Sequence, residues 1–230
     1  MNHFIAENIS GEKGWLNADE THHAQRVLRL KPKVHISVTQ GDGKIYRAIL
    51  EPGLKKVQPF KIEALVREEN QAKLHLAVAP TKSNDRFEFF LEKATELGVA
   101  SITPIICQNS ERKVYKQVRG QRIIMAAVKQ SKKGWIPTLQ QQKTFPQFLE
   151  TVQGANAYLA HLNSGPRANL KTINLKKEHW ILIGPEGDFS PSEIKMAQEK
   201  KLGFLDLGEE VLRTETAAIS VAAAAAYQRL

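Results

Sequence analysis

Short runs in which apolar and polar residues alternate fill the first seventy positions, and this period of two is typical of half-buried strands. Two such runs, residues 34–40 and 44–50, flank Gly41-Asp42-Gly43, which is a strong hairpin signal. A third run, residues 57–66, follows the turn at Pro52-Gly53. Short strands joined by tight turns predict a small β-barrel over residues 1–70. The polar run at residues 67–71 marks its end.

A short helix is predicted between the first strand of this barrel and the hairpin. Asp19 is a suitable N-cap, because a side-chain carboxylate can accept a hydrogen bond from the first free backbone N–H groups. Ala24, Val27 and Leu28 follow at helical spacing and predict the buried face of the helix.

The pattern changes after residue 71, where strand-like and helix-like segments alternate. Residues 85–97 show apolar positions at helical spacing, and Gly98 follows as a C-cap. The other helices are predicted at residues 116–132, 145–152, 192–201 and 214–227, and the strands at residues 74–79, 102–107, 157–162, 180–183 and 204–207. This alternation predicts an α/β domain with a mainly parallel sheet over residues 71–230.

The composition excludes several classes of protein. The chain has no run of about 18 apolar residues, which a membrane-spanning helix needs. Met1 is not followed by the basic and apolar regions of a secretory signal, so we expect a cytoplasmic protein. Cys107 is the only cysteine, and we expect it to be a small buried residue. No His or Cys spacing typical of metal ligands occurs, and we expect no metal.

The positive charge is concentrated in the middle of the chain. The net charge is +9, and residues 73–142 hold 12 Lys/Arg against 5 Asp/Glu. Part of this charge falls on one face of the predicted helix 116–132, and a second cluster follows the short N-terminal helix. Such clusters bind phosphates without reading sequence, although solvated faces would look the same. The candidate RNA-binding residues are Arg26, Arg29, Arg112, Lys113, Arg119, Arg122, Lys129, Lys132 and Lys133.

Three corners follow predicted strands in the C-terminal half, at residues 160–165, 183–187 and 207–214. Ligands of open α/β sheets bind beyond the carboxyl ends of the strands. Gly184, Gly187 and Gly208 lie at these corners, where glycine lets a ligand approach the backbone, and Pro185 stiffens one of them. Together the corners could bind a planar, uncharged group such as adenine. The alternative is that each glycine only makes a turn.

Several nucleotide-binding and catalytic motifs are absent from the chain. It contains neither the Gly-rich dinucleotide fingerprint nor a P-loop, and it has no Gly-x-Ser-x-Gly elbow. The ligand that remains compatible with the sequence is nucleotide-like and carries no polyphosphate. Arg213 and Glu215 flank the start of the last helix. The arginine could stabilise negative charge in a ligand, and Glu215 could simply complement the helix dipole.

From end to end the chain resembles the RsmE family, which are bacterial 16S ribosomal RNA (uracil-N3) methyltransferases of the SPOUT superfamily. The stretches that carry the resemblance are HHAQRVLRL (22–30), EKATELGVASITPI (92–105), KQS with IPTL (129–139), LIGPEGDFSPSE (182–193) and LGEEVLRTETAA (207–218). The last two stretches are highly specific to the family.

This resemblance implies a PUA-like β-barrel followed by an α/β SPOUT domain with a C-terminal trefoil knot. It also implies a homodimer that binds S-adenosylmethionine in the knot, with 16S ribosomal RNA or the assembled small subunit as partner. The cofactor-binding residues that it implies are Leu162, Gly184, Pro185, Glu186, Gly187, Leu207, Gly208, Val211, Leu212, Arg213, Thr214 and Ala217.

The chemistry of this reaction asks mainly for in-line positioning of the methyl group against N3 of uracil. The N3 proton must leave, and Arg213 is a candidate to stabilise the resulting anion. Glu186 and Glu215 are the candidate bases, and each would need a pKa raised by burial. Loss of the proton to solvent is the alternative.

Three positions depart from the family pattern. Asp188 stands where the family usually has glycine, and it adds a negative charge or caps the following helix. Lys129 replaces a glutamate and Lys133 an arginine, which keeps a cation at the second position but loses the bidentate fork. A non-catalytic RNA-binding ribosome assembly factor and a SPOUT enzyme with another RNA target remain as alternatives. The sequence does not decide between free RNA and the assembled subunit as substrate.

Overall fold

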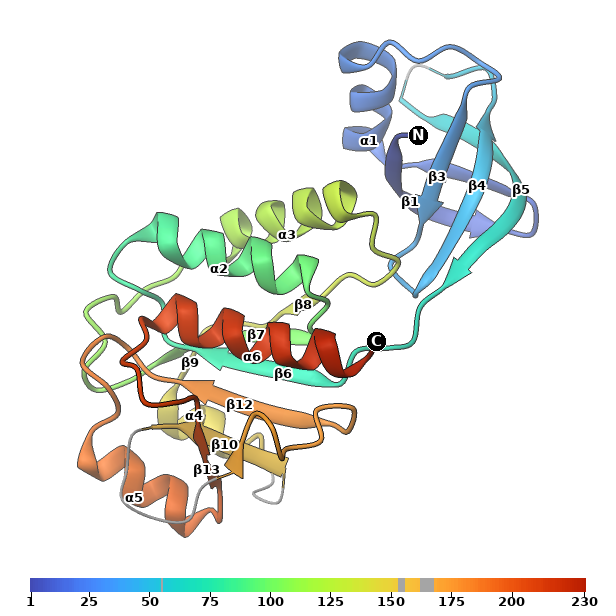
Figure 1. Ribbon diagram of the computed structural model, residues 1–230. Coiled ribbons are helices and arrows are strands. Elements are labelled where there is room, and N and C mark those ends of the chain that lie inside the picture. The colour runs from blue at the N-terminus through green and yellow to red at the C-terminus, as the bar shows by residue number, and fades with distance from the viewer. Residues whose placement is uncertain (55, 153–155, 162–167) are drawn as a thin grey trace. The chain divides into compact units, whose positions relative to one another are not determined.

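The computed structural model of the chain describes residues 1–54, 56–152, 156–161 and 168–230, and they divide into two compact units (Figure 1). Unit 1 comprises Met1–Gln71 and Met125–Ile136. Unit 2 comprises Ala72–Ile124 and Pro137–Leu230.

Unit 1 contains the predicted β-barrel. Its five strands close in the order β1-β2-β5-β4-β3, and only the β1–β3 pair is parallel. Alternate side chains point inward and pack around Phe4, Ile36 and Phe60, which are almost completely buried. The strands are β1 (His3–Ser10), β2 (Lys13–Leu16), β3 (His35–Thr39), β4 (Lys44–Leu50) and β5 (Gln58–Glu68).

The short helix of unit 1 differs from the prediction in its cap and in its buried face. It begins after Asn17, not after Asp19, because the Asn17 side chain accepts from the backbone N–H of Glu20. The α-helix α1 (Ala18–His22) passes into a π-helical turn, η1 (His23–Val27). The wider turn shifts the following positions away from a period of 3.6 residues. Val27 and Leu28 are therefore exposed by 60% and 38%, whereas Ala24 is buried.

A segment from the middle of the chain, residues 125–136, belongs to unit 1 by its contacts, although it lies within the predicted second domain, residues 71–230. Gly43 donates its backbone N–H to the carbonyl of Gly134 over 3.0 Å. The Glu69 carboxylate accepts from the backbone N–H groups of Gly134 and Trp135. Gly134 lies so close that an added Cβ atom would be 2.6 Å from the Gly43 carbonyl oxygen. No local pattern predicts such a contact between distant residues.

Unit 2 is built on a parallel sheet, as the alternation of strands and helices predicts. Its path runs β11-β13-β10-β12-β6-β7-β8, and β9 also pairs with β7. The carboxyl ends of the strands therefore lie along one edge of the sheet. The strands are β6 (Leu74–Val78), β7 (Ser101–Ile106), β8 (Thr138–Leu139), β9 (Lys143–Thr144), β10 (Ala157–Ala160), β11 (Ala168–Asn169), β12 (His179–Ile183) and β13 (Gly203–Asp206).

Helices cover both faces of this sheet. Figure 1 shows α2 (Asn84–Glu96) and α6 (Thr214–Gln228) on one face, and α4 (Phe145–Leu149) and α5 (Pro191–Glu199) on the other. The helix α3 (Gln117–Ser131) begins in unit 2 and ends in unit 1. No helix of the described residues is long and apolar enough to cross a membrane.

Candidate active site

The bend after β12 is shaped by tight packing and by a capped helix. Gly184 lies close to the Phe189 ring, because an added Cβ atom there would be 3.1 Å from it, and glycine avoids this tight contact. The helix α5 then begins at Ser190, which forms a capping box with Glu193. The Glu193 carboxylate also accepts from the backbone N–H of Gln108, which joins this helix start to the end of β7. The hydrogen bonds of Glu193 therefore fix the bend both to the start of α5 and to the segment that follows β7.

A second loop, residues 207–213, lies against this bend. Gly208 adopts a φ of +116°, which side-chain-bearing residues rarely adopt, and an added Cβ atom would meet no other atom within 4 Å. At the end of the loop, the Thr214 hydroxyl donates to the Gly184 carbonyl over 2.9 Å. This buried hydrogen bond fixes the start of α6 to the bend after β12.

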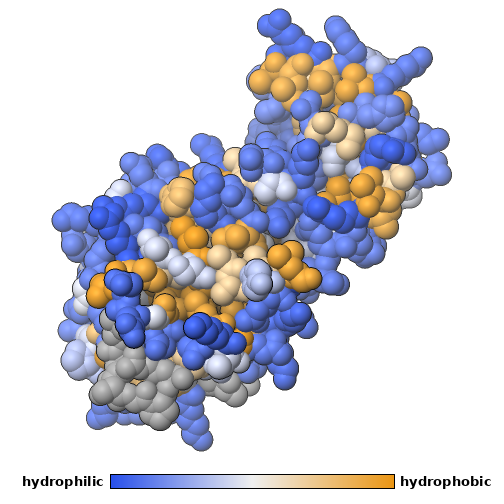
Figure 2. Space-filling view, viewed as in Figure 1, coloured by the Kyte–Doolittle hydropathy of each residue, from blue (hydrophilic) through white to orange (hydrophobic). Residues whose placement is uncertain are grey.

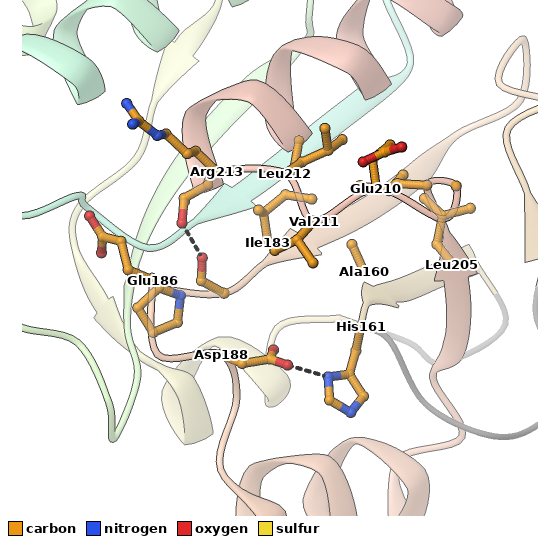
Figure 3. A pocket seen from close by; sticks show the side chains of 16 residues that line it. Ala160, His161, Ile183, Glu186, Asp188, Leu205, Glu210, Val211, Leu212 and Arg213 are labelled. Atoms are coloured by element: carbon orange, nitrogen blue, oxygen red, sulfur yellow. Dashed lines mark hydrogen bonds and ion pairs between the residues drawn. The ribbon is translucent and has the colours of Figure 1, made fainter.

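The two loops and the end of β10 enclose a cavity of about 310 Å³ (Figure 3). Its wall is mainly apolar, and the charged side chains in it are those of Glu186, Asp188, Glu210, Arg213 and, when protonated, His161. The complete lining is Ala160, His161, Ile183, Gly184, Pro185, Glu186, Asp188, Leu205, Leu207, Gly208, Glu210, Val211, Leu212, Arg213, Thr214 and Ala217. A cavity of this size, with exposed backbone and apolar walls, suits a nucleoside-sized ligand.

Most of the residues expected to surround a cofactor lie in this lining. Leu162 falls outside the described residues. Gly187 is not among the lining residues, and its carbonyl accepts from the Asn109 side chain; its contact with a cofactor stays a prediction. The residue set implied by the resemblance lacks six lining residues, of which the first three and the last lie within the predicted corners: Ala160, His161, Ile183, Asp188, Leu205 and Glu210.

Asp188 does not cap the following helix, which Ser190 does. Its carboxylate oxygen Oδ2 lies 2.7 Å from Nδ1 of His161, and Oδ1 accepts from the backbone N–H of Phe189 over 2.7 Å (Figure 3). Asp188 has a φ of 57°, in the left-handed region where Asp, Asn and Gly are the favoured residues. The pair joins the carboxyl ends of two neighbouring parallel strands, β10 and β12.

The three candidate catalytic residues have different surroundings. The Glu215 side chain is buried, is not among the lining residues, and lies 3.8 Å from the Arg86 guanidinium; its role as a base stays a prediction. Glu186 lines the cavity but is exposed, and its carboxylate accepts from the backbone N–H of Lys82. The burial that a base at this position would need is therefore missing. Arg213 is exposed, and its guanidinium extends away from the His161–Asp188 pair (Figure 3).

Cys107 lies behind this site, where β7 ends, and it is buried as expected. Burial, together with the negative charge of Glu193, raises the pKa of the thiol. The group therefore stays protonated at neutral pH and is a poor nucleophile.

Several of the candidate RNA-binding cations are engaged within the protein. Lys129 forms a 2.7 Å ion pair with the buried Glu20 inside unit 1. Arg119 pairs with Glu88. Two others donate to backbone carbonyls: Arg112 to those of Thr81 and Lys82, and Lys113 to those of Cys107 and Gln108.

Other candidate cations point to solvent. In unit 1, Arg26 and Arg29 are exposed beside Val27 and Leu28. Figure 2 shows this mixture of apolar and hydrophilic side chains over the short helix. Lys132 is exposed and has a φ of 52°, and Lys133 is half-buried. In unit 2, Arg122 is exposed on α3.

Comparison with known proteins identifies the two parts of the chain separately. The RNA methyltransferase domain family matches residues 67–226, and the RNA methyltransferase PUA domain family matches residues 16–58. The ribosomal RNA small subunit methyltransferase E of Synechocystis is 34% identical over 88% of this chain and 69% of its own length. The protein of the same description from Mesomycoplasma hyopneumoniae is 33% identical over 84% of this chain and 86% of its own.

A solved structure shows the same fold over nearly the whole chain. It is the ribosomal RNA small subunit methyltransferase E of Neisseria gonorrhoeae bound to S-adenosylmethionine. The sequences are 28% identical, the TM-score is 0.83, and the match covers 97% of this chain and 96% of the other.

Proposed function

Because this chain belongs to the RNA methyltransferase family, and within it to ribosomal RNA small subunit methyltransferase E, we propose that it methylates N3 of a specific uridine in 16S ribosomal RNA. It is an S-adenosylmethionine-dependent enzyme. The observation that carries the proposal is the cavity at the carboxyl ends of β10, β12 and β13, whose lining includes residues from both of the most family-specific stretches of the sequence.

The cavity has the chemistry that S-adenosylmethionine requires. Apolar side chains such as Ile183, Leu205 and Leu212 provide walls for the adenine ring, and the space beside Gly208 is open. No Gly-rich phosphate cradle is needed, because this cofactor carries no phosphate. When bound, the cofactor supplies an electrophilic methyl group on a sulfonium. The protein then has to hold it, exclude water and present the uridine in line.

Arg213 is the residue that we assign to the uracil anion. Its exposed guanidinium lies at the edge of the cavity and extends out of it, where a base entering from solvent would be met. It would stabilise the negative charge that spreads from N3 onto the flanking carbonyl oxygens. Glu215 is not among the residues that line the cavity, and Glu186 is exposed, so we assign departure of the N3 proton to solvent.

Both units offer surfaces for the RNA. Arg26 and Arg29 in unit 1 and Arg122 in unit 2 are exposed, and none of them has an ion-pair partner among the described residues. Phosphate contacts from such residues position a folded RNA, and the active site selects the base. The substrate is free 16S ribosomal RNA or the assembled small subunit.

Three further properties belong to this proposal. The family resemblance supports a trefoil knot around the cofactor, and the hydrogen bond from Thr214 to Gly184 joins the two loops that such a knot would bring together. It also supports a homodimer. A ribosomal substrate places the enzyme in the cytoplasm.

The reaction can be tested directly. Ribosomal RNA from a strain that lacks this protein is mapped for N3-methyluridine and is then incubated with purified protein and S-adenosylmethionine. We expect one uridine of the small-subunit RNA to lack the methyl group in the deletion strain and to gain it in vitro. Persistence of every N3-methyluridine in the deletion strain would contradict the assignment.

Three further measurements separate the alternatives. A non-catalytic assembly factor would fail to bind S-adenosylhomocysteine in calorimetry, whereas the enzyme binds it as its product. A related enzyme with another target would methylate a different nucleotide, which mass spectrometry of RNA fragments would locate. Comparing free RNA with isolated small subunits as substrates decides which of them the enzyme uses.

A further inference from the structure

The His161–Asp188 pair is held more firmly than a surface ion pair. One carboxylate oxygen of Asp188 accepts from the His161 ring and the other from the Phe189 backbone N–H, both over 2.7 Å. The backbone of Asp188 is fixed too, since the Asn109 side chain donates to its carbonyl oxygen. Because an ionised carboxylate can only accept, the imidazole must donate from Nδ1. These contacts give the carboxylate one orientation.

The His161–Asp188 pair also forms part of the cavity wall. Both residues line the cavity, and 49% of the Asp188 side chain remains accessible, whereas only 14% of the His161 side chain does. Each carboxylate oxygen has more than one acceptor site, so the two internal hydrogen bonds leave capacity for a ligand. Asp188 is therefore an oriented and accessible negative charge at the wall of the cavity.

The charges of the lining are mostly negative. It contains the carboxylates of Glu186, Asp188 and Glu210 and a single guanidinium, that of Arg213. Figure 3 shows the Arg213 guanidinium and the Glu186 carboxylate directed away from the His161–Asp188 pair. Within the lining, Asp188 is thus an anchored carboxylate whose partner is the His161 ring, and the Arg213 guanidinium points away from it. Such a site favours a positively charged ligand over a neutral one of the same shape.

We propose that Asp188, oriented by His161, makes the pocket select the positively charged S-adenosylmethionine over the neutral product S-adenosylhomocysteine. The inference rests on the proposed function. The two ligands share their nucleoside and amino-acid parts and differ in one methyl group and the sulfonium charge. Asp188 is a specificity-determining residue in this scheme, and His161 is a positioning residue. The family's usual glycine at this position would leave the pocket without this charge.

The test is calorimetric titration of the full-length protein with each of the two ligands. The variants Asp188→Asn and Asp188→Gly remove the charge, and both residues tolerate the left-handed backbone at this position. We expect the ratio of the Kd for S-adenosylhomocysteine to the Kd for S-adenosylmethionine to fall about three- to tenfold in both variants. Glu209→Gln is the matched control, because Glu209 is an exposed neighbouring carboxylate outside the lining, and it should leave the ratio unchanged.

A second pair of variants tests His161. His161→Asn keeps a donor near the position of Nδ1 and should retain the wild-type ratio, whereas His161→Leu removes the donor and should lower it. The proposal is overturned if the Asp188 variants weaken both ligands equally, which would indicate a role in pocket shape, or if they leave the ratio unchanged. A wild-type protein that binds neither ligand would instead overturn the proposed function.

Discussion

Single residues show that position in the sequence does not decide what a carboxylate or a guanidinium does. Glu215 follows Arg213 by two residues, yet its side chain turns toward Arg86 on α2 while Arg213 remains at the cavity. Asp188, one residue past the Gly184–Gly187 bend, joins the cavity wall through His161. Residues that look equivalent in the sequence therefore have separate roles, and each can be tested by substitution.

At this scale we predict that Arg213→Ala loses most of the turnover. Removing one group that stabilises developing charge costs about 10²–10³-fold in kcat. Because the guanidinium extends away from the His161–Asp188 pair, the Kd for S-adenosylmethionine should change little. Arg213→Lys keeps the charge and should recover part of the rate. The measurement is single-turnover methylation of the RNA, and a near wild-type rate for Arg213→Ala would exclude this residue from the reaction.

At the scale of elements, contacts between distant segments complete unit 1. The segment 125–136 returns to the barrel, where the Thr39 hydroxyl and the Gly43 N–H both donate to the Gly134 carbonyl. Nearby, Lys129 pairs with the buried Glu20. A basic residue that the helical pattern places among the candidate RNA-binding side chains is thus paired within the unit.

We predict that Gly134→Ala destabilises unit 1. The new methyl group would lie 2.6 Å from the Gly43 carbonyl oxygen, and overpacking of this kind costs about 1–3 kcal/mol of unfolding free energy. Gly11→Ala is the comparison, because its methyl group meets no atom within 4 Å and the residue bears only the strain of a φ of +61°, roughly 1–2 kcal/mol.

Hydrogen exchange of peptides that cover the β3–β4 hairpin measures this effect locally. Gly134→Ala should speed exchange at the hairpin, whereas Gly11→Ala should act mainly at the β1–β2 turn. Wild-type protection of the hairpin in Gly134→Ala would show that the returning segment contributes little to the barrel.

At the scale of the whole molecule, the net charge of +9 favours RNA, but only exposed cations without internal partners are free to contact phosphates. The structure distinguishes exposed cations without an internal partner from cations that form ion pairs. Arg26 in unit 1 and Arg122 in unit 2 are exposed, whereas Lys93 is held by Glu92 and Glu96. Cations on both units suit a large substrate that contacts each of them.

We predict that Arg26→Ala and Arg122→Ala each weaken RNA binding and lower the slope of log K against log salt by about 1. Binding of a small-subunit RNA fragment is measured at several salt concentrations. Lys93→Ala removes the same charge from a paired site and should leave the slope unchanged. Equal effects of all three substitutions would indicate that only the total charge matters.

The sequence by itself determined the barrel, the alternating α/β pattern and the two loops of the cavity, because periodicity, turn residues and glycines act locally. It also identified most of the lining, since loops that follow parallel strands meet at one edge of a sheet. The tertiary structure decided which side chains meet across long separations: His161 with Asp188, Glu215 with Arg86, and Gly43 with Gly134. These contacts depend on packing between distant segments, which no period of two or 3.6 residues encodes.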